Sequence, residues 1–196
     1  MTRKKRIWIP NEFYHIVCRG NRRDPLFKSS EDFLALLHIL EQLHAKIPFE
    51  IASYCLMTNH YHLQMRSQAE SLSKVMALIN KRYANYYNAR YELTGHVYEK
   101  RFYDRMIYGP EGMFEVSRYI HLNPVEAGMV GRPEHYPWSS YHLFMNTRTV
   151  VPSYMNVNSI IQQYAGKESQ QRNQYCQLID LSMSEIANQA EITGGK

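Results

Sequence analysis

The sequence predicts an α+β protein of the ferredoxin-like, split βαβ type: an antiparallel sheet with helices on one face, plus a small helical C-terminal tail. Two observations support this prediction. Apolar runs of strand length and stretches of helical spacing follow one another in the order strand, helix, strand, strand, helix, strand, helix. The chain has 196 residues, 44% of them hydrophobic, which is enough for a sizeable core.

The first half of the chain supplies three expected strands and one helix. Residues 13–17 form a short strand that is apolar on both faces, and the Gly-Asn-Arg-Arg-Asp-Pro run at 20–25 breaks it. A helix is expected from Ser29 or Ser30 to about Ala45, because leucines recur there at helical spacing. Pro48 ends this element, and strands follow at 49–57 and 61–65.

The second half begins with a helix introduced by Ser67 and Glu70, which resemble a capping box. Residues 97–107 are expected to form a loop and a fourth strand. A last core helix should begin at Pro110 and end near Leu122, because the position before Pro124 is biased away from helix. The composition becomes rich in Gln, Asn and Ser after residue 145, so we predict a domain over 1–145 and a helical extension over 146–196.

The overall composition is compatible with an anionic partner. The net charge is +5, the pI is about 9.0, and 16 tyrosines could in part serve as surfaces on which bases stack. Three widely spaced cysteines give no disulfide framework and no zinc motif. There is no apolar run of membrane-spanning length and no signal peptide, so a cytoplasmic, nucleoid-associated protein is expected, with no membrane partner.

The most informative stretch is His60-Tyr61-His62. In a strand, residues two apart point to the same face, so the two imidazoles would project side by side. Two neutral imidazoles can hold one divalent metal when one or two further ligands are added. A structural pair of histidines is the alternative interpretation.

A second stretch, on the last core helix, offers Tyr119 and Asn123. Residues four apart share one helical face. Tyrosine is a weak nucleophile near neutral pH, but a metal that neutralises a phosphodiester would allow attack and a covalent phosphotyrosine. The alternatives are a packing tyrosine and an asparagine that caps the helix end. His121 should point away from Tyr119 and serve in packing or DNA contact.

Basic residues that alternate with aromatic ones indicate nucleic-acid binding, although solvated surface charge is the plainer interpretation of each cluster. The candidate DNA contacts lie in an N-terminal arm, a loop after the first strand, the second helix and the 97–107 segment. They are Arg3, Lys4, Lys5, Arg6, Arg22, Arg23, Lys81, Arg82, Lys100, Arg101 and Arg105.

Five stretches together resemble the REP-associated tyrosine transposases, which belong to the single-tyrosine HUH transposases. They are the segments at 19–22, 54–63, 95–98, 118–128 and 136–141. The resemblance covers roughly residues 5–145. It implies that His60 and His62 bind Mg²⁺ or Mn²⁺, that Tyr119 is the nucleophile, and that Asn123 stands where relatives carry a third ligand. It also implies that the arm at 3–6 reads bases at the foot of a hairpin.

We therefore expect a metal-dependent endonuclease and strand transferase that cleaves single-stranded DNA near hairpins through a 5′-phosphotyrosine intermediate. One alternative is a non-catalytic hairpin-binding regulator, and another is a hydrolase that uses water. Tyr98, Tyr103 and Tyr108 are rival nucleophiles, but none precedes an Asn-Pro pair by one helical turn. A homodimer with the tyrosine acting across subunits and a monomer both remain open, as does the preferred metal.

Overall fold

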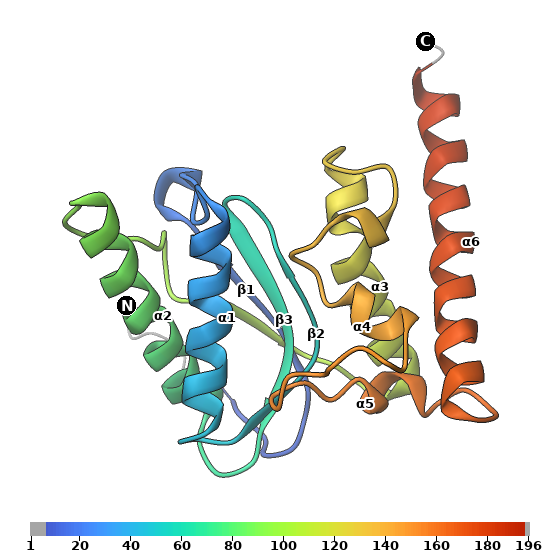
Figure 1. The fold of residues 1–196 in the computed structure, drawn as a ribbon, viewed down its shortest axis with the longest axis horizontal. Coiled ribbons are helices and arrows are strands. Elements are labelled where there is room, and N and C mark those ends of the chain that lie inside the picture. Colours follow the sequence, from blue (N-terminus) through green and yellow to red (C-terminus); the bar gives the residue numbers. More distant parts are fainter. Residues whose placement is uncertain (1–6, 195–196) are drawn as a thin grey trace.

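The computed structural model describes residues 7–194, with side chains described up to residue 186. Four strands form one antiparallel sheet in the order β2-β3-β1-β4 (Figure 1). The strands are β1 Tyr14–Arg19, β2 Phe49–Leu56, β3 His60–Ser67 and β4 Tyr103–Met106. The helices are α1 Ser30–His44, α2 Leu72–Tyr91, α3 Gly109–Glu126, α4 Tyr141–Met145, α5 Asn158–Ile161 and α6 Glu168–Gly194. Short 3₁₀ turns lie at Asn21–Arg23 and Pro133–His135.

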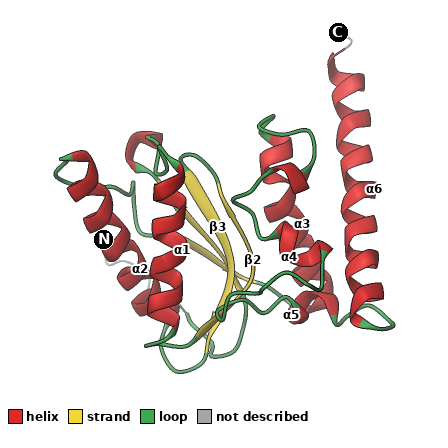
Figure 2. Cartoon of the chain, in the orientation of Figure 1, coloured by secondary structure: helices red, strands yellow, loops and turns green. Residues whose placement is uncertain are grey.

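The predicted α+β, split βαβ arrangement is confirmed. Helices α1 and α2 cover one face of the sheet, as expected (Figure 2). From the sequence we expected helices on one face only. The opposite face is also covered, by α3 and the helices that follow it. The second layer of helices gives the sheet two buried faces.

Side chains of β3 alternate between these two layers. Tyr61 points toward the first layer, where its hydroxyl donates to Asn80 Oδ1 of α2 at 2.5 Å. Gln64 points the other way and donates to the backbone oxygen of Met113 in α3 at 3.0 Å. This alternation places His60 and His62 on the α3 side of the sheet.

Two local predictions are wrong. Ser67 and Glu70 form no capping box: β3 extends to Ser67, whose hydroxyl donates to the Glu70 carbonyl, and Ser71 caps α2 by accepting from the Lys74 amide. Helix α3 does not end near Leu122 but continues through Pro124 to Glu126. A proline inside a helix removes one backbone donor, yet neighbouring bonds persist, and the Ala127 amide donates to Asn123.

Residues after 145 pack against the sheet and α3. The Ile51 amide of β2 donates to the Tyr154 carbonyl at 2.8 Å, and the Asn156 amide donates back to Ile51 at 2.8 Å. Tyr175 of α6 is fully buried between α3 and α4, and its hydroxyl lies 2.7 Å from His121 Nδ1. The described helices include none that is long and apolar enough to cross a membrane.

Candidate metal and tyrosine site

His60 and His62 project from β3 on the same face, with ring centroids 4.9 Å apart. His60 Nδ1 lies 2.8 Å from the Asn59 amide oxygen, which directs the other ring nitrogen, Nε2, away from the β2–β3 turn. His62 Nδ1 lies 2.9 Å from His15 Nε2. The remaining nitrogen, His62 Nε2, is buried and has no hydrogen-bond partner within the described part of the chain. Such an orphaned buried nitrogen is available as a ligand.

Both histidines are held in the neutral form. Burial lowers the pKa of His62 well below its usual value, and electrostatic interactions with His15, His60 and the charged Arg19 act in the same direction. Burial also lowers the pKa of His60, with a further contribution from Arg19, while a hydrogen bond with Asn123 raises it. A neutral imidazole keeps a lone pair, which is the form that binds metals.

Helix α3 brings Tyr119 and Asn123 to the same place. The Tyr119 ring stands edge-on to His62, with centroids 5.4 Å apart, and it remains 41% exposed. Asn123, one turn later, is buried, and its side chain hydrogen-bonds with His60. Because α3 continues past Pro124, both residues keep the common helical face that their spacing predicts.

The residues that could hold a metal are therefore two imidazoles and one amide. The described residues contain no group of three or more His, Cys, Asp or Glu side chains that could share an ion. A metal here would thus take its further ligands from Asn123, water or a phosphate oxygen. An oxygen-completed set of this kind leaves open positions for a substrate, which suits catalysis better than a closed structural site.

His15 is a neighbour of the site that sequence reasoning missed. It lies on β1, and its ring stacks on His62 at 5.2 Å and meets Tyr119 edge-on at 5.8 Å. Burial, reinforced by the charge of Arg105, lowers the pKa of His15 to about 4, so this ring is also neutral near pH 7. The proximity depends on the pairing of β1 with β3, in which Val17 lies opposite His62. Nothing local in the sequence marks that register.

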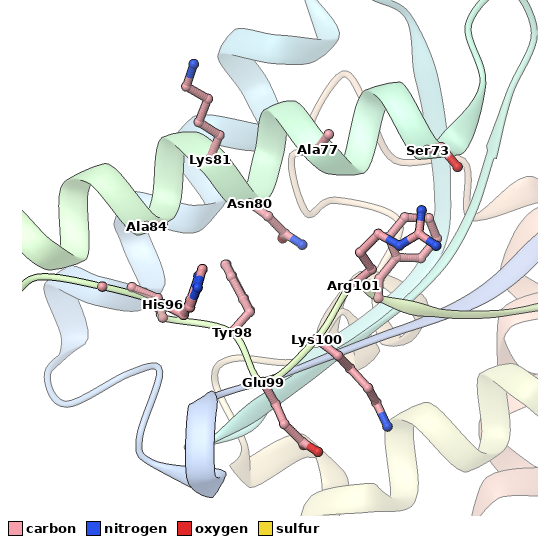
Figure 3. A pocket seen from close by; sticks show the side chains of 13 residues that line it. Ser73, Ala77, Asn80, Lys81, Ala84, His96, Tyr98, Glu99, Lys100 and Arg101 are labelled. Carbon is pink, nitrogen blue, oxygen red and sulfur yellow. The ribbon is translucent and has the colours of Figure 1, made fainter. Parts of the chain in front are cut away.

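The predicted DNA-contact residues do not gather at one place. Arg22 and Arg23 are exposed on a turn whose neighbour Gly20 donates its amide to the Asn59 carbonyl, one residue before His60. Arg105 of β4 lies near His15, beside the same site. Lys81, Lys100 and Arg101 instead lie around a separate hollow between α2 and the 95–102 segment, and the side chains of Lys81 and Lys100 point away from it (Figure 3). Arg82 lines neither place, and Arg3, Lys4, Lys5 and Arg6 lie outside the described residues.

The alternative tyrosines lie elsewhere. Tyr98 contacts Tyr61 on the α2 side of the sheet. Tyr103 and Tyr108 are exposed by 53% and 73%. Among the described tyrosines, Tyr119 has ring contacts with both His15 and His62. His121 is completely buried between Tyr175 and Ser140, so it serves in packing rather than DNA contact.

Comparison with known proteins places these residues in a family. The family model described as "Transposase IS200 like" matches residues 10–123, a segment that holds His15, His60, His62, Tyr119 and Asn123. A protein named as a REP-associated tyrosine transposase in Haemophilus influenzae is 24% identical over 107 residues, covering 48% of this chain and 60% of that protein's length.

A solved structure described as a REP-associated tyrosine transposase bound to a REP hairpin has the same fold. It superposes with a TM-score of 0.64 and 21% identity, covering 86% of this chain and 93% of the other. The resemblance predicted from the sequence motifs is thereby confirmed. The match over more than half of the chain shows that it belongs to the IS200-like transposase family.

Proposed function

We propose that this protein is a metal-dependent, tyrosine-dependent endonuclease and strand transferase that acts on single-stranded DNA beside hairpins. The main observation in support is that the Tyr119 ring stands edge-on to His62, whose Nε2 is buried without a hydrogen-bond partner among the described residues. The hairpin as substrate is inferred from the solved relative, which is described as bound to one. Binding of DNA alone requires neither the orphaned nitrogen nor an accessible tyrosine beside it.

His60, His62 and Asn123 would hold Mg²⁺ or Mn²⁺. When bound, the ion would neutralise the charge of the scissile phosphate and polarise phosphorus toward attack. His15 would fix His62 by accepting from Nδ1–H, which leaves Nε2 with the lone pair that a ligand needs. Arg105, Arg22 and Arg23 would steer the DNA backbone toward the site.

Tyr119 would supply the nucleophile. As its hydroxyl loses a proton, Oη forms a bond to phosphorus, the bond from phosphorus to the 3′-oxygen breaks, and that oxygen leaves as a hydroxyl after taking up a proton. The DNA 5′ end then stays attached to Tyr119 as a phosphotyrosine. A 3′-hydroxyl of another DNA end can reverse the step, so strands are rejoined without ATP.

A denaturing gel tests the proposal. Labelled hairpin DNA with single-stranded flanks is incubated with Mn²⁺ and wild-type protein, Tyr119→Phe, or the control Tyr103→Phe, which changes an exposed tyrosine on β4. We expect a covalent band with wild type and Tyr103→Phe, no such band with Tyr119→Phe, and none without metal. A band that persists in Tyr119→Phe would rule out this nucleophile. Cleavage without any covalent band would indicate the water-using hydrolase, and binding without cleavage would indicate the regulator.

A further inference from the structure

The turn that carries Arg22 and Arg23 has an unusual backbone. Both residues have positive φ angles, 54° and 65°, in the left-handed region that residues with side chains rarely adopt. Two successive residues of this kind persist only where neighbouring contacts hold them, and such strain gathers at functional sites. The turn follows β1 and lies beside the β2–β3 connection, which leads directly into His60.

Asn59, the last residue of that connection, contacts the turn at both ends. Its backbone carbonyl accepts from the Gly20 amide at 2.8 Å, and its side-chain amide nitrogen donates to the Arg23 carbonyl at 3.2 Å. The side-chain oxygen of the same residue lies 2.8 Å from His60 Nδ1. One half-buried amide therefore joins the arginine turn to a candidate metal ligand.

The Arg23 carbonyl decides how this amide is oriented. A carbonyl oxygen can only accept a hydrogen bond, so it requires the NH₂ end of the Asn59 side chain. The oxygen end must then face His60, and because an amide oxygen also only accepts, His60 Nδ1 must carry the proton. In a neutral imidazole, a proton on Nδ1 leaves the lone pair on Nε2.

The other amide near His60 does not have this constraint. Asn123 hydrogen-bonds with His60, but no described neighbour holds one end of its side chain as Arg23 holds Asn59. Either end of the Asn123 amide can therefore face the ring. Neutral imidazole in solution favours the proton on Nε2, and a protonated nitrogen cannot bind a metal. The contact with Asn59 opposes that preference.

We propose that Asn59 is a positioning residue that sets the tautomer of His60, because it holds the proton on Nδ1 and leaves Nε2 free to bind a divalent metal. The Arg23 carbonyl orients Asn59, which ties the arginine turn and the metal ligand into one unit. The inference deepens the proposed function and rests on it for the identity of the site. It adds that Arg22 and Arg23 stand at a fixed place relative to the metal, so that a DNA phosphate held by them has one position.

The test reads the tautomer of His60 directly, without metal or DNA. Two-bond nitrogen–proton correlation spectra of protein with isotope-labelled histidine, recorded at about pH 7.5 where this ring is neutral, distinguish a proton on Nδ1 from one on Nε2. The signals of His60 are those that disappear in His60→Gln.

Three variants separate the two contacts of the amide. Asn59→Ala removes both, whereas Asn59→Asp keeps an acceptor for His60 but cannot donate to the Arg23 carbonyl. Asn146→Ala is the control, because this exposed asparagine also hydrogen-bonds to the backbone, in the loop after α4.

We expect the proton on Nδ1 in wild type, Asn59→Asp and Asn146→Ala, and mainly on Nε2 in Asn59→Ala. Mn²⁺ affinity, measured by electron paramagnetic resonance, should fall about tenfold in Asn59→Ala and should not fall in Asn59→Asp. The Arg23 and Asp24 amides, which donate within the turn, should exchange faster with solvent deuterium in both Asn59 variants, since both lose the donor that holds the turn.

A proton on Nε2 in wild type would overturn the proposal, as would an unchanged tautomer in Asn59→Ala. A shift to Nε2 in Asn59→Asp as large as that in Asn59→Ala would show that the acceptor does not set the tautomer. Unchanged amide exchange in both Asn59 variants would show that the turn and the metal ligand are not one unit. The covalent-adduct assay judges the nuclease separately, because it depends on Tyr119, whereas the tautomer is read without a reaction.

Discussion

His15 Nε2 lies 2.9 Å from His62 Nδ1, across the pairing of β1 with β3. Because His15 engages Nδ1, the buried Nε2 is the ring nitrogen of His62 that has no hydrogen-bond partner among the described residues. Partners of this kind orient metal-binding imidazoles and fix their tautomer. The relationship gives a first prediction that concerns metal binding directly.

Replacing His15 with Ala should weaken Mn²⁺ binding by about 10- to 100-fold, because His62 would lose the partner that fixes its ring. His15→Gln should retain most of the affinity, since the amide oxygen can still accept from His62 Nδ1–H. Mn²⁺ affinity is measured by electron paramagnetic resonance without DNA. His38→Ala, at an exposed histidine of α1, is the control. If His15→Ala bound Mn²⁺ as tightly as wild type, His15 would have no role in metal binding.

Gly20→Ala should disturb the loop beside His60. An added Cβ would lie 2.2 Å from the Asp24 carbonyl oxygen, so the backbone that carries Arg22 and Arg23 must shift. We expect covalent-adduct formation to fall at least about tenfold, because small misplacements near a reacting group are costly. Gly131→Ala is the matched control, since a Cβ there meets nothing within 4 Å. Equal adduct yields in the two variants would show that the loop does not position the substrate.

The ring stack at Phe33 should matter for stability. Phe33 is buried, with Phe27 on one side and Trp138 on the other, both at 4.4 Å between centroids. Phe33→Ala should lower the free energy of unfolding by about 3–5 kcal/mol, because it leaves a cavity between two aromatic rings. Leu34→Ala, at a side chain that is 56% exposed, should cost no more than about 0.5 kcal/mol. Urea unfolding measures the free energy of unfolding of both variants. Similar decreases in the two variants would show that the ring stack does not contribute to the stability of the core.

Stability should fall in acid because of buried neutral histidines. Burial, with a smaller effect from His142, lowers the pKa of His121 to about 3, far below its usual 6.5. Between these pH values the unfolded chain binds a proton that the folded chain does not. The contribution of this group to the free energy of unfolding therefore has its full value above about pH 6.5 and decreases as the pH falls toward 3. His15 and His62 shift the same way.

The measurement is urea unfolding at about pH 7 and about pH 5. Wild type and His135→Gln, which changes an exposed histidine, should lose the same stability between the two pH values. His121→Gln should lose less, because it removes one group whose proton uptake favours unfolding. A steeper or equal loss in His121→Gln would contradict the assignment. The comparison of slopes holds even if this variant is less stable at both pH values.

Local spacing in the sequence was sufficient for the pairs that a single element positions. The i, i+2 spacing of His60 and His62 and the i, i+4 spacing of Tyr119 and Asn123 place each pair on one face, and the structure has both arrangements. Spacing was insufficient where neighbouring elements decide. Pro124 does not end α3, since packing of the last turn outweighs one missing donor. His15 was missed because its place depends on strand register, which has no local signature.

The burial of Tyr175 beneath α3 bears on how much of the chain the reaction needs. Its hydroxyl contacts His121 and Ser117, which flank Tyr119 on the same helix, although Tyr175 lies beyond the segment that matches the family. A shortened chain that kept every motif but ended near residue 145 would leave a hole behind the helix that carries the tyrosine. Exchanging the motif-bearing portion between relatives should therefore succeed only when the C-terminal portion is exchanged with it.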